Sequence, residues 1–369
     1  MKAASLACRR VSALSLIVAL GLGGSGAALA LTAAEVAGLT GPERQKILED
    51  GARKEGELLW VGSFNEENAK PILDGFKARY PYITVNRVRT DSVKALQRVL
   101  AEVRARTPRT DLITSSSVLE LGQADAVQAF KSPVLDLYPP STRDPEGKWA
   151  ALYFTYVGFA AYNTDLVPDA QAPRAYDDLL DPKWKGQMVW SNGGSTGAPF
   201  FITFLRMQWG EDKALAYLEK LSKQSIVTRT SSGRTVLGMT VSGEHKIMIA
   251  PYLSHIAEGA KQKAPIAGVM VDPVPFSPSP FLMAKGAPHP HATMLLIDYL
   301  LDKEAQTVLR DARYYPAHPD VPPADELLPY LPKSKGLNGF LLDDAELSKM
   351  LPESQKIFSR LFECREGRS

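Results

Sequence analysis

Two predicted helix starts carry groups that could bind a small anion. Ser195-Thr196-Gly197-Ala198 stands at the first of them, where the free N–H groups and the dipole of a helix favour negative charge. Arg234 follows Ser231-Ser232-Gly233 at the second, and a guanidinium can hold a carboxylate or a phosphonate through two parallel hydrogen bonds. The sequence therefore predicts an anion site built from these two segments.

Each of these side chains also has a purely structural alternative. The hydroxyls of Ser195 and Thr196 could cap their helix, and because capping is compatible with ligand contact, we predict both roles. Arg234 could be a solvated surface charge. Ser115 and Ser116 follow another predicted strand and could also contact the ligand, although serine is common in any loop.

Aromatic residues at two predicted loop edges could cover such a ligand. Phe64 and Asn65 follow the first predicted strand, and Tyr252 follows a later one. An aromatic ring packs in a core more often than it contacts a ligand. Phe64, Asn65 and Tyr252 nevertheless complete the predicted binding set, because they stand at strand ends.

A hydrolase is the alternative from another class of protein. Residues 193–197 fit the pattern G-x-S-x-G with Ser195 as nucleophile, and Asp298 and His318 follow in the chain order of such enzymes. Against this interpretation, two residues separate the strand from the first glycine, and no HGGG-type loop precedes it. We therefore predict no catalytic residue and no enzymatic activity.

No metal or cofactor motif stands out. His289-Pro290-His291 has a spacing that can chelate, but it opens a predicted helix, so we expect a solvent-facing cap. HExxH, P-loop and dinucleotide fingerprints are missing from the sequence. Cys364 is the only thiol outside the first 30 residues. We predict neither a metal site nor a cofactor.

The first 30 residues have the features of a signal peptide. Lys2, Arg9 and Arg10 precede an apolar run at 11–22, and Ala28-Leu29-Ala30 offers a cleavage site. Cleavage after Ala30 would leave 339 residues and change the formal net charge from +2 to −1. We expect a soluble, periplasmic protein of two domains, with no nucleic-acid partner, since binding to a phosphate backbone calls for a basic face.

The elements that must position these residues alternate between strands and helices. Strands are predicted at 57–61, 83–88 and 111–114, with helices after Asn65, around 93–103 and at 118–126. The same order recurs with strands at 187–190 and 246–250 and helices at 198–209 and 215–221. This pattern predicts open α/β sheets, which place ligands beyond the carboxyl ends of their strands.

Two stretches give the chain a family resemblance. Residues 55–117 contain EGELLWVGSF, FKARYPYITVNRV and AEVRARTPRTDLITSSS, and residues 160–187 contain AAYNTDLV and YDDLLDPKWKGQ. They resemble the iron-type, ferric-binding-protein-like branch of the bacterial periplasmic solute-binding proteins that serve ABC importers. The resemblance implies a type II-like fold with two α/β lobes and a ligand cleft between them. The lobes would comprise 31–157 plus 279–320 and 158–278 plus 321–369, and they would close by hinge motion.

The resemblance also implies partners and a ligand class. The partners would be a small-molecule ligand and an inner-membrane ABC permease, with the protein a monomer. Ferric-binding members use a His, a carboxylate and an adjacent Tyr pair, whereas the matching positions here hold Phe64 or Asn65, then Ser116, then Tyr252 and Leu253. Ferric ion needs several anionic oxygens, so we predict a small organic anion and keep ferric iron as the alternative. Tyr314-Tyr315 is expected to pack.

Overall fold

The computed structural model describes residues 31–64, 66–192 and 197–363. The signal-peptide prediction and the predicted site residues Asn65, Ser195 and Thr196 lie outside the described residues, as does Cys364. Within the described ranges, no helix combines the length and the apolar character needed to span a bilayer.

The first of two sheets is mixed and has eight described strands. Its order is β12-β5-β11-β3-β1-β2, and β4 and β13 also pair with β11. Glycine 62 in β1 lies opposite Thr114 in β3 and Arg89 in β2, and all three strands run in parallel. Their carboxyl ends therefore meet at one edge. The strands are β1 (Glu57–Gly62), β2 (Thr84–Arg89), β3 (Leu112–Thr114), β4 (Val127–Gln128), β5 (Trp149–Tyr156), β11 (Val274–Ala284), β12 (Tyr315–Pro316) and β13 (Gly339–Leu341).

Helices cover both faces of this sheet because its central strands are apolar on both sides. Leu58 and Trp60 point into a core shared with α2, α3, α10 and α11, and Ile113 points into a second core with α4 and α5. The helices are α1 (Ala33–Ala37), α2 (Arg44–Glu55), α3 (Glu66–Arg79), α4 (Ser92–Ala105), α5 (Val118–Gln123), α10 (Pro290–Leu301) and α11 (Lys303–Asp311).

The second sheet has five described strands in the order β10-β6-β9-β7-β8. Helices α6, α7 and α12 pack on one face against Trp190, and α8 and α9 pack on the other against Val189. The strands are β6 (Ala160–Asn163), β7 (Met188–Ser191), β8 (Val227–Arg229), β9 (Ile247–Ile249) and β10 (Ile266–Val269); the helices are α6 (Ala198–Trp209), α7 (Glu211–Leu221), α8 (Gly233–Val241), α9 (Leu253–Lys261) and α12 (Asp344–Phe358).

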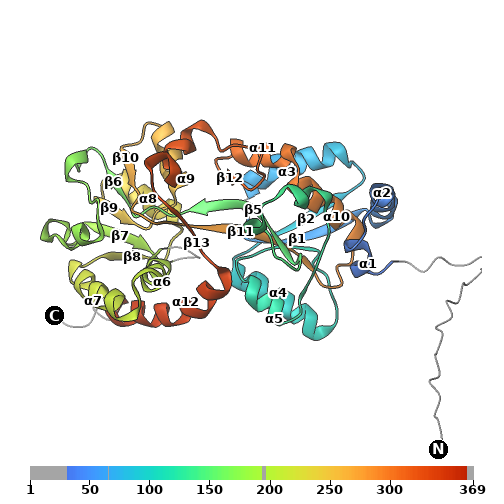
Figure 1. Cartoon of the computed structure of the whole chain (residues 1–369), viewed down its shortest axis with the longest axis horizontal. Helices are drawn as coiled ribbons and strands as arrows, with labels where there is room; N and C mark the ends of the chain where they lie inside the picture. The colour runs from blue at the N-terminus through green and yellow to red at the C-terminus, as the bar shows by residue number, and fades with distance from the viewer. Residues whose placement is uncertain (1–30, 65, 193–196, 364–369) are drawn as a thin grey trace, which may run out of the picture. The chain divides into compact units, whose positions relative to one another are not determined.

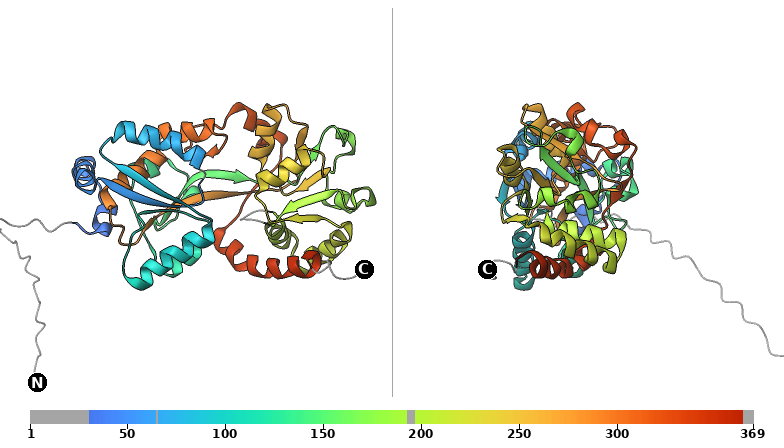
Figure 2. Two further views of the ribbon diagram at one scale, coloured as in Figure 1. Left: turned by 180° about the vertical axis from the view of Figure 1, so that it is seen from behind. Right: turned by 90° about the vertical axis from the view of Figure 1, so that its left-hand side faces the viewer.

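Two long strands connect the sheets. Strands β5 and β11 pair antiparallel from Tyr156 and Phe276 to Trp149 and Leu282, and Figures 1 and 2 show them side by side in the region between the two groups of helices. Beyond β5 the chain enters β6 of the second sheet. The lobe boundaries given above remain a prediction.

The expected elements agree with the structure to within a few residues. One difference has a clear cause: the helix expected over 118–126 ends at Gln123. Val127 and Gln128 form β4 against Met283 and Ala284 of β11, so the apolar residues after Gln123 serve a strand and not a further helical turn.

Candidate ligand-binding site

The carboxyl edge of the first sheet carries three predicted site residues. Phe64 follows β1 and is only 2% exposed, stacked on Trp60 with ring centroids 5.8 Å apart. Ser115 is buried, and its Oγ accepts a hydrogen bond from the Ser117 N–H. Ser116 is exposed, and its N–H donates to Ser92 Oγ. Ser115 therefore shapes the loop, and Ser116 is the one of these two serines that is open to solvent.

Arg87 in β2 packs against the residues at this edge of the sheet. Its side chain is only 5% exposed, and its guanidinium lies 4.5 Å from the Trp60 ring centroid. Nη2 donates to the Phe64 carbonyl oxygen at 2.8 Å, while Nε is buried without a hydrogen-bond partner among the described residues. Burial lowers the pKa of Arg87. The buried cation thus fixes the backbone at Phe64.

Phe64 belongs to an aromatic cluster that it forms with Tyr153 and Tyr314. The ring centroids of Tyr153 and Tyr314 are 4.2 Å apart, and that of Phe64 lies 5.9 and 5.6 Å from them. Asn68 Nδ2 donates to the Tyr314 hydroxyl oxygen at 2.8 Å. Both tyrosines are half-buried, so the aromatic cluster packs without being wholly covered.

The carboxyl edge of the second sheet holds the two predicted helix starts. Ser191 ends β7 opposite Arg229 of β8, and its Oγ donates to the Ser231 carbonyl oxygen at 2.6 Å. Helix α6 begins after Gly197, and α8 begins after Ser232, whose Oγ accepts a hydrogen bond from the Thr235 N–H. The adjacent ends of β7 and β8 therefore bring the Gly197 and Arg234 segments to one edge.

Gly197 is required by its backbone conformation. It has φ +93° and ψ −147°, a region that only glycine occupies without strain. A Cβ there would lie 2.0 Å from the Ser191 carbonyl oxygen. The α6 start can approach the end of β7 this closely only because residue 197 has no side chain.

We expect Gly197→Ala to lower the free energy of unfolding by at least about 2 kcal/mol, from backbone strain and the contact with Ser191. Urea denaturation measures the change. Gly238→Ala in the middle of α8 is the matched control, because a Cβ there has no heavy atom within 4 Å and alanine favours a helix by about 1 kcal/mol. Equal effects of the two substitutions would contradict the prediction.

Arg234 lies beside α9. Its Nη1 donates to Glu258 Oε2 at 2.6 Å, and the two side chains are 56% and 31% exposed. Tyr252 precedes α9, its backbone bridges to Val157 just beyond β5, and its ring lies within 4 Å of the Cβ position at Gly233. Arg234, Tyr252 and Glu258 therefore form one polar group.

This polar group lies within electrostatic reach of the aromatic cluster. Burial raises the pKa of Tyr314. Glu258 and Tyr252 raise this pKa by smaller amounts, whereas Asn68 and Arg234 lower it. Burial also raises the pKa of Tyr153, and Tyr314 and Tyr252 raise it further. Residues from both sheets therefore lie near one another here. Phe64, Arg234 and Tyr252 of the predicted set are among them, joined by Tyr153, Tyr314, Asn68 and Glu258.

His255 adds a half-buried neutral imidazole to α9. Its ring packs edge-on against Tyr252, with centroids 5.2 Å apart, and its Nδ1 is covered without a partner in the described structure. Burial, with the nearby Arg234 charge, lowers the pKa of His255 to about 4. The folded protein therefore binds the His255 proton more weakly than the unfolded chain does.

We expect this difference to make the protein sensitive to acid. The contribution of neutral His255 to stability is complete above the unfolded pKa of about 6.5 and is lost as pH falls towards 4, by up to about 3 kcal/mol. Unfolding free energies between pH 7.5 and 4 for wild type and His255→Phe would measure it. The variant's curve should be flatter, and parallel curves would assign the acid sensitivity to other groups.

The prediction of a solvent-facing histidine cap is wrong. His289 Nδ1 lies 2.9 Å from Asp111 Oδ2, and His291 Nδ1 lies 2.5 Å from Glu55 Oε1. The Asp111 side chain is fully buried, and burial raises its pKa. The two imidazoles thus interact with two different carboxylates, Asp111 and Glu55. Among the described residues, no group of three His, Cys, Asp or Glu side chains is placed to hold a metal ion.

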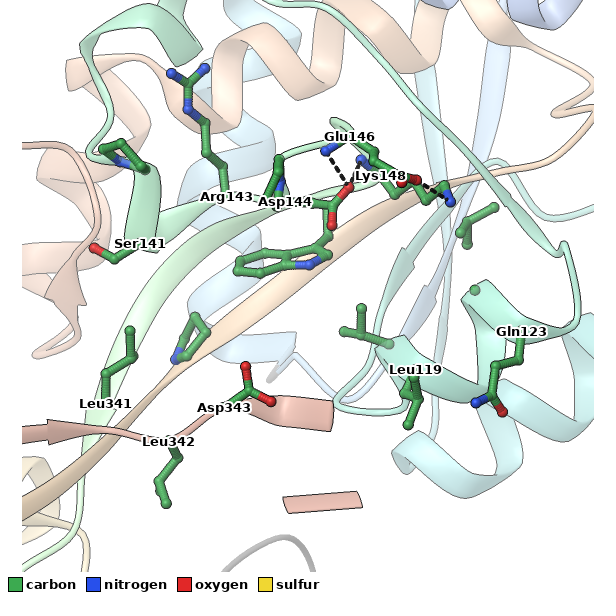
Figure 3. Close-up of a pocket in the computed structure, with 17 residues that line it drawn as sticks. Leu119, Gln123, Ser141, Arg143, Asp144, Glu146, Lys148, Leu341, Leu342 and Asp343 are labelled. Carbon is green, nitrogen blue, oxygen red and sulfur yellow. Dashed lines mark hydrogen bonds and ion pairs between the residues drawn. The ribbon is translucent and has the colours of Figure 1, made fainter. Parts of the chain in front are cut away.

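Two sizeable cavities lie elsewhere. One of about 660 Å³ is lined by α5, the 140–149 segment and residues 341–343, as Figure 3 shows. Three of its charged residues are engaged with one another: Asp144 accepts the N–H groups of Glu146 and Lys148, and Lys148 pairs with Glu146. Another, of about 960 Å³, lies between α1 and residues 128–147. The residues lining these two cavities include none of the described predicted site residues.

Comparison with known proteins identifies the family. The family described as "Bacterial extracellular solute-binding protein" matches residues 107–335. The chain belongs to this family. As a solute-binding protein of the class that serves ABC importers, it binds a small molecule and docks with an ABC permease. A Salmonella typhi relative, provisionally named a 2-aminoethylphosphonate-binding periplasmic protein, is 24% identical over 242 residues, which are 62% of this chain and 68% of the relative.

Solved structures show the two-lobe fold of this solute-binding protein. The apo ferric ion-binding protein A of Pasteurella haemolytica matches with a TM-score of 0.70 and 19% identity, over 85% of this chain and 100% of that one. A periplasmic binding protein of Actinobacillus pleuropneumoniae with bound fructose-6-phosphate matches with a TM-score of 0.69 and 22% identity, over 84% and 99%. Fold and family resemblance predicted from the sequence are therefore confirmed.

Proposed function

We propose that this solute-binding protein captures a small organic anion between its two sheets and delivers it to an inner-membrane permease. The observation that carries the proposal is that the adjacent ends of β7 and β8 lead into the Gly197 helix start and the Arg234 segment, since both favour negative charge. Two proteins that this chain resembles point to the same chemistry: one is provisionally named for a phosphonate and the other holds a sugar phosphate.

Ferric iron is the less favoured cargo. At the positions where ferric-binding relatives carry ligands, Phe64 is buried against Trp60, Ser116 has no charge, and Leu253 is fully buried. Tyr315, the second member of the other tyrosine pair, is buried against Tyr156. Too few anionic oxygens remain for a hard trivalent ion.

Binding without catalysis is also part of the proposal. A hydrolase would need Asp298 to orient His318, but Asp298 is held by Arg44, and His318 Nδ1 accepts the Asp320 N–H at 3.1 Å. Both residues of the hydrolase alternative are thus engaged elsewhere. We further propose that the signal peptide is cleaved after Ala30, and that the periplasmic protein is a monomer that binds no nucleic acid.

Native mass spectrometry of protein purified from the periplasm without denaturation tests the proposal. We expect a polypeptide beginning at Leu31 and a small bound anion that is released on unfolding. Bound iron, seen as a coloured tyrosinate complex, would favour the ferric alternative. Ester hydrolysis that disappears in Ser195→Ala would favour the hydrolase.

A further inference from the structure

The Arg234 guanidinium forms an ion pair with a carboxylate. Glu258 Oε2 accepts a hydrogen bond from Arg234 Nη1 at 2.6 Å, so the pair carries no net charge. An anion that approaches Arg234 also approaches the Glu258 carboxylate. Because juxtaposed like charges are costly, a ligand with only negative charge would be opposed at this point.

A ligand that also carries a positive charge would remove this conflict. Arg234 has five N–H donors, and Glu258 takes one of them, so donors remain for an anionic group. Glu258 has a second carboxylate oxygen that could accept from an ammonium. Both side chains are solvent-accessible, at 56% and 31% exposed, and no rearrangement of α8 or α9 is needed to reach them.

The aromatic residues near Arg234 and Glu258 fit the same ligand. The half-buried rings of Tyr153 and Tyr314 stand in the aromatic cluster with Phe64, and Tyr252 lies beside Arg234's helix start. The faces of aromatic rings attract an ammonium group. Glu258 and Arg234 lie close enough to Tyr314 to influence its pKa, so a cation bound by Glu258 would have this phenol ring in its vicinity.

We propose that the solute is a zwitterion whose amine is bound by Glu258 and whose anionic group is bound by Arg234. The inference rests on the proposed function, because it assumes an anionic ligand at Arg234. It narrows the ligand class to small amino acids and aminoalkyl phosphonates or phosphates, and it disfavours sugar phosphates without an amine.

Matched ligands with and without an amine test the inference. Calorimetry would compare 2-aminoethylphosphonate with ethylphosphonate, and β-alanine with propionate. In wild type we expect the amine-bearing member of at least one pair to bind at least 30-fold more tightly. In Glu258→Gln this preference should vanish: affinity for the amine-bearing compound falls at least tenfold, whereas affinity for its partner stays or rises, because the opposing carboxylate is gone. Glu353→Gln, at an exposed pair with Lys356 on α12, is the control and should match wild type.

The outcomes separate this inference from the proposed function. Equal affinity within each pair, or a preference that survives in Glu258→Gln, overturns the zwitterion and leaves the anion proposal standing. An amine-free anion found in protein purified natively also overturns the zwitterion and leaves the anion proposal standing. Binding of none of the four compounds also overturns the inference, and the natively bound solute then decides the anion proposal by itself. A neutral or purely cationic natural solute overturns both.

Discussion

Replacing Arg234 with alanine should weaken binding of the natively bound anion by about 2 to 4 kcal/mol, a factor of roughly 30 to 900 in the dissociation constant. The substitution removes the guanidinium and leaves both the ligand's anionic group and Glu258 without their partner. Arg234→Lys should also bind poorly, since an ammonium lacks the planar fork that holds two oxygens at once. Calorimetric titration of the three proteins measures the effect.

Melting temperatures of the ligand-free proteins provide the control. The Arg234–Glu258 pair is exposed in the free protein, and exposed pairs contribute about 0 to 1 kcal/mol to stability. All three ligand-free proteins should therefore unfold at nearly the same temperature. Unchanged affinity in both variants would make Arg234 a surface charge, and anion binding would then depend on the α6 start alone.

Arg44→Met should lower the free energy of unfolding by about 3 to 5 kcal/mol, because it leaves a buried carboxylate unpaired. Arg44 is 7% exposed and Asp298 15% exposed. Two bonds of 2.5 and 3.1 Å join them, and the same guanidinium also donates to the carbonyl oxygens of Leu39 and Lys131. This side chain ties α2 to α10 and to the loop before residue 133.

Its pH dependence distinguishes an unpaired charge from lost packing. Burial raises the pKa of Asp298 even beside Arg44, and removal of the cation should raise it further. A raised folded-state pKa means that stability is lost as pH rises, so the deficit of Arg44→Met should be larger at pH 8 than at pH 5.

Two further proteins complete this experiment, with urea denaturation as the measurement. Arg44→Met combined with Asp298→Leu should recover most of the loss, since an apolar pair can replace a buried ion pair. Lys70→Met, at the exposed pair with Asp74, should cost less than about 0.5 kcal/mol. A loss that is independent of pH and remains in the double variant would contradict the electrostatic explanation.

The fold was predictable because its elements have strong local patterns. Buried strands such as β1 and β7 are short apolar runs, and α6 spans the expected residues 198–209. The helix starts that hold Gly197 and Arg234 were predictable for a related reason, because helix starts leave a signature in adjacent residues. Their contact with a ligand stays a prediction.

Residues that depend on distant partners were not predictable in this way. Tyr314 joins the site through Asn68, which is 246 positions away, and no local pattern separates it from its packed neighbour Tyr315. His291 meets Glu55 across 236 positions, which is why the prediction of a solvent-facing cap was wrong. Arg87 occupies an alternating position of a strand, and the groups that explain a cation there are seen only in the folded chain: the Trp60 ring, the Phe64 carbonyl oxygen and the Glu66 carboxylate.

The proline content of β11 has a mechanical consequence. From Ser277 to Pro280, β11 pairs with β5 alone among the described strands, because β13 pairs with 274–276 and β3 with 281–283. Pro278 and Pro280 have no N–H to donate, and the register shifts between Ser279 and Pro280. The connection is therefore held by the fewest strand hydrogen bonds over these four residues. The stiffness of this connection would set how often the two lobes separate. The frequency of separation would in turn set the rate at which solute enters and leaves, without any contribution from the residues that touch the solute.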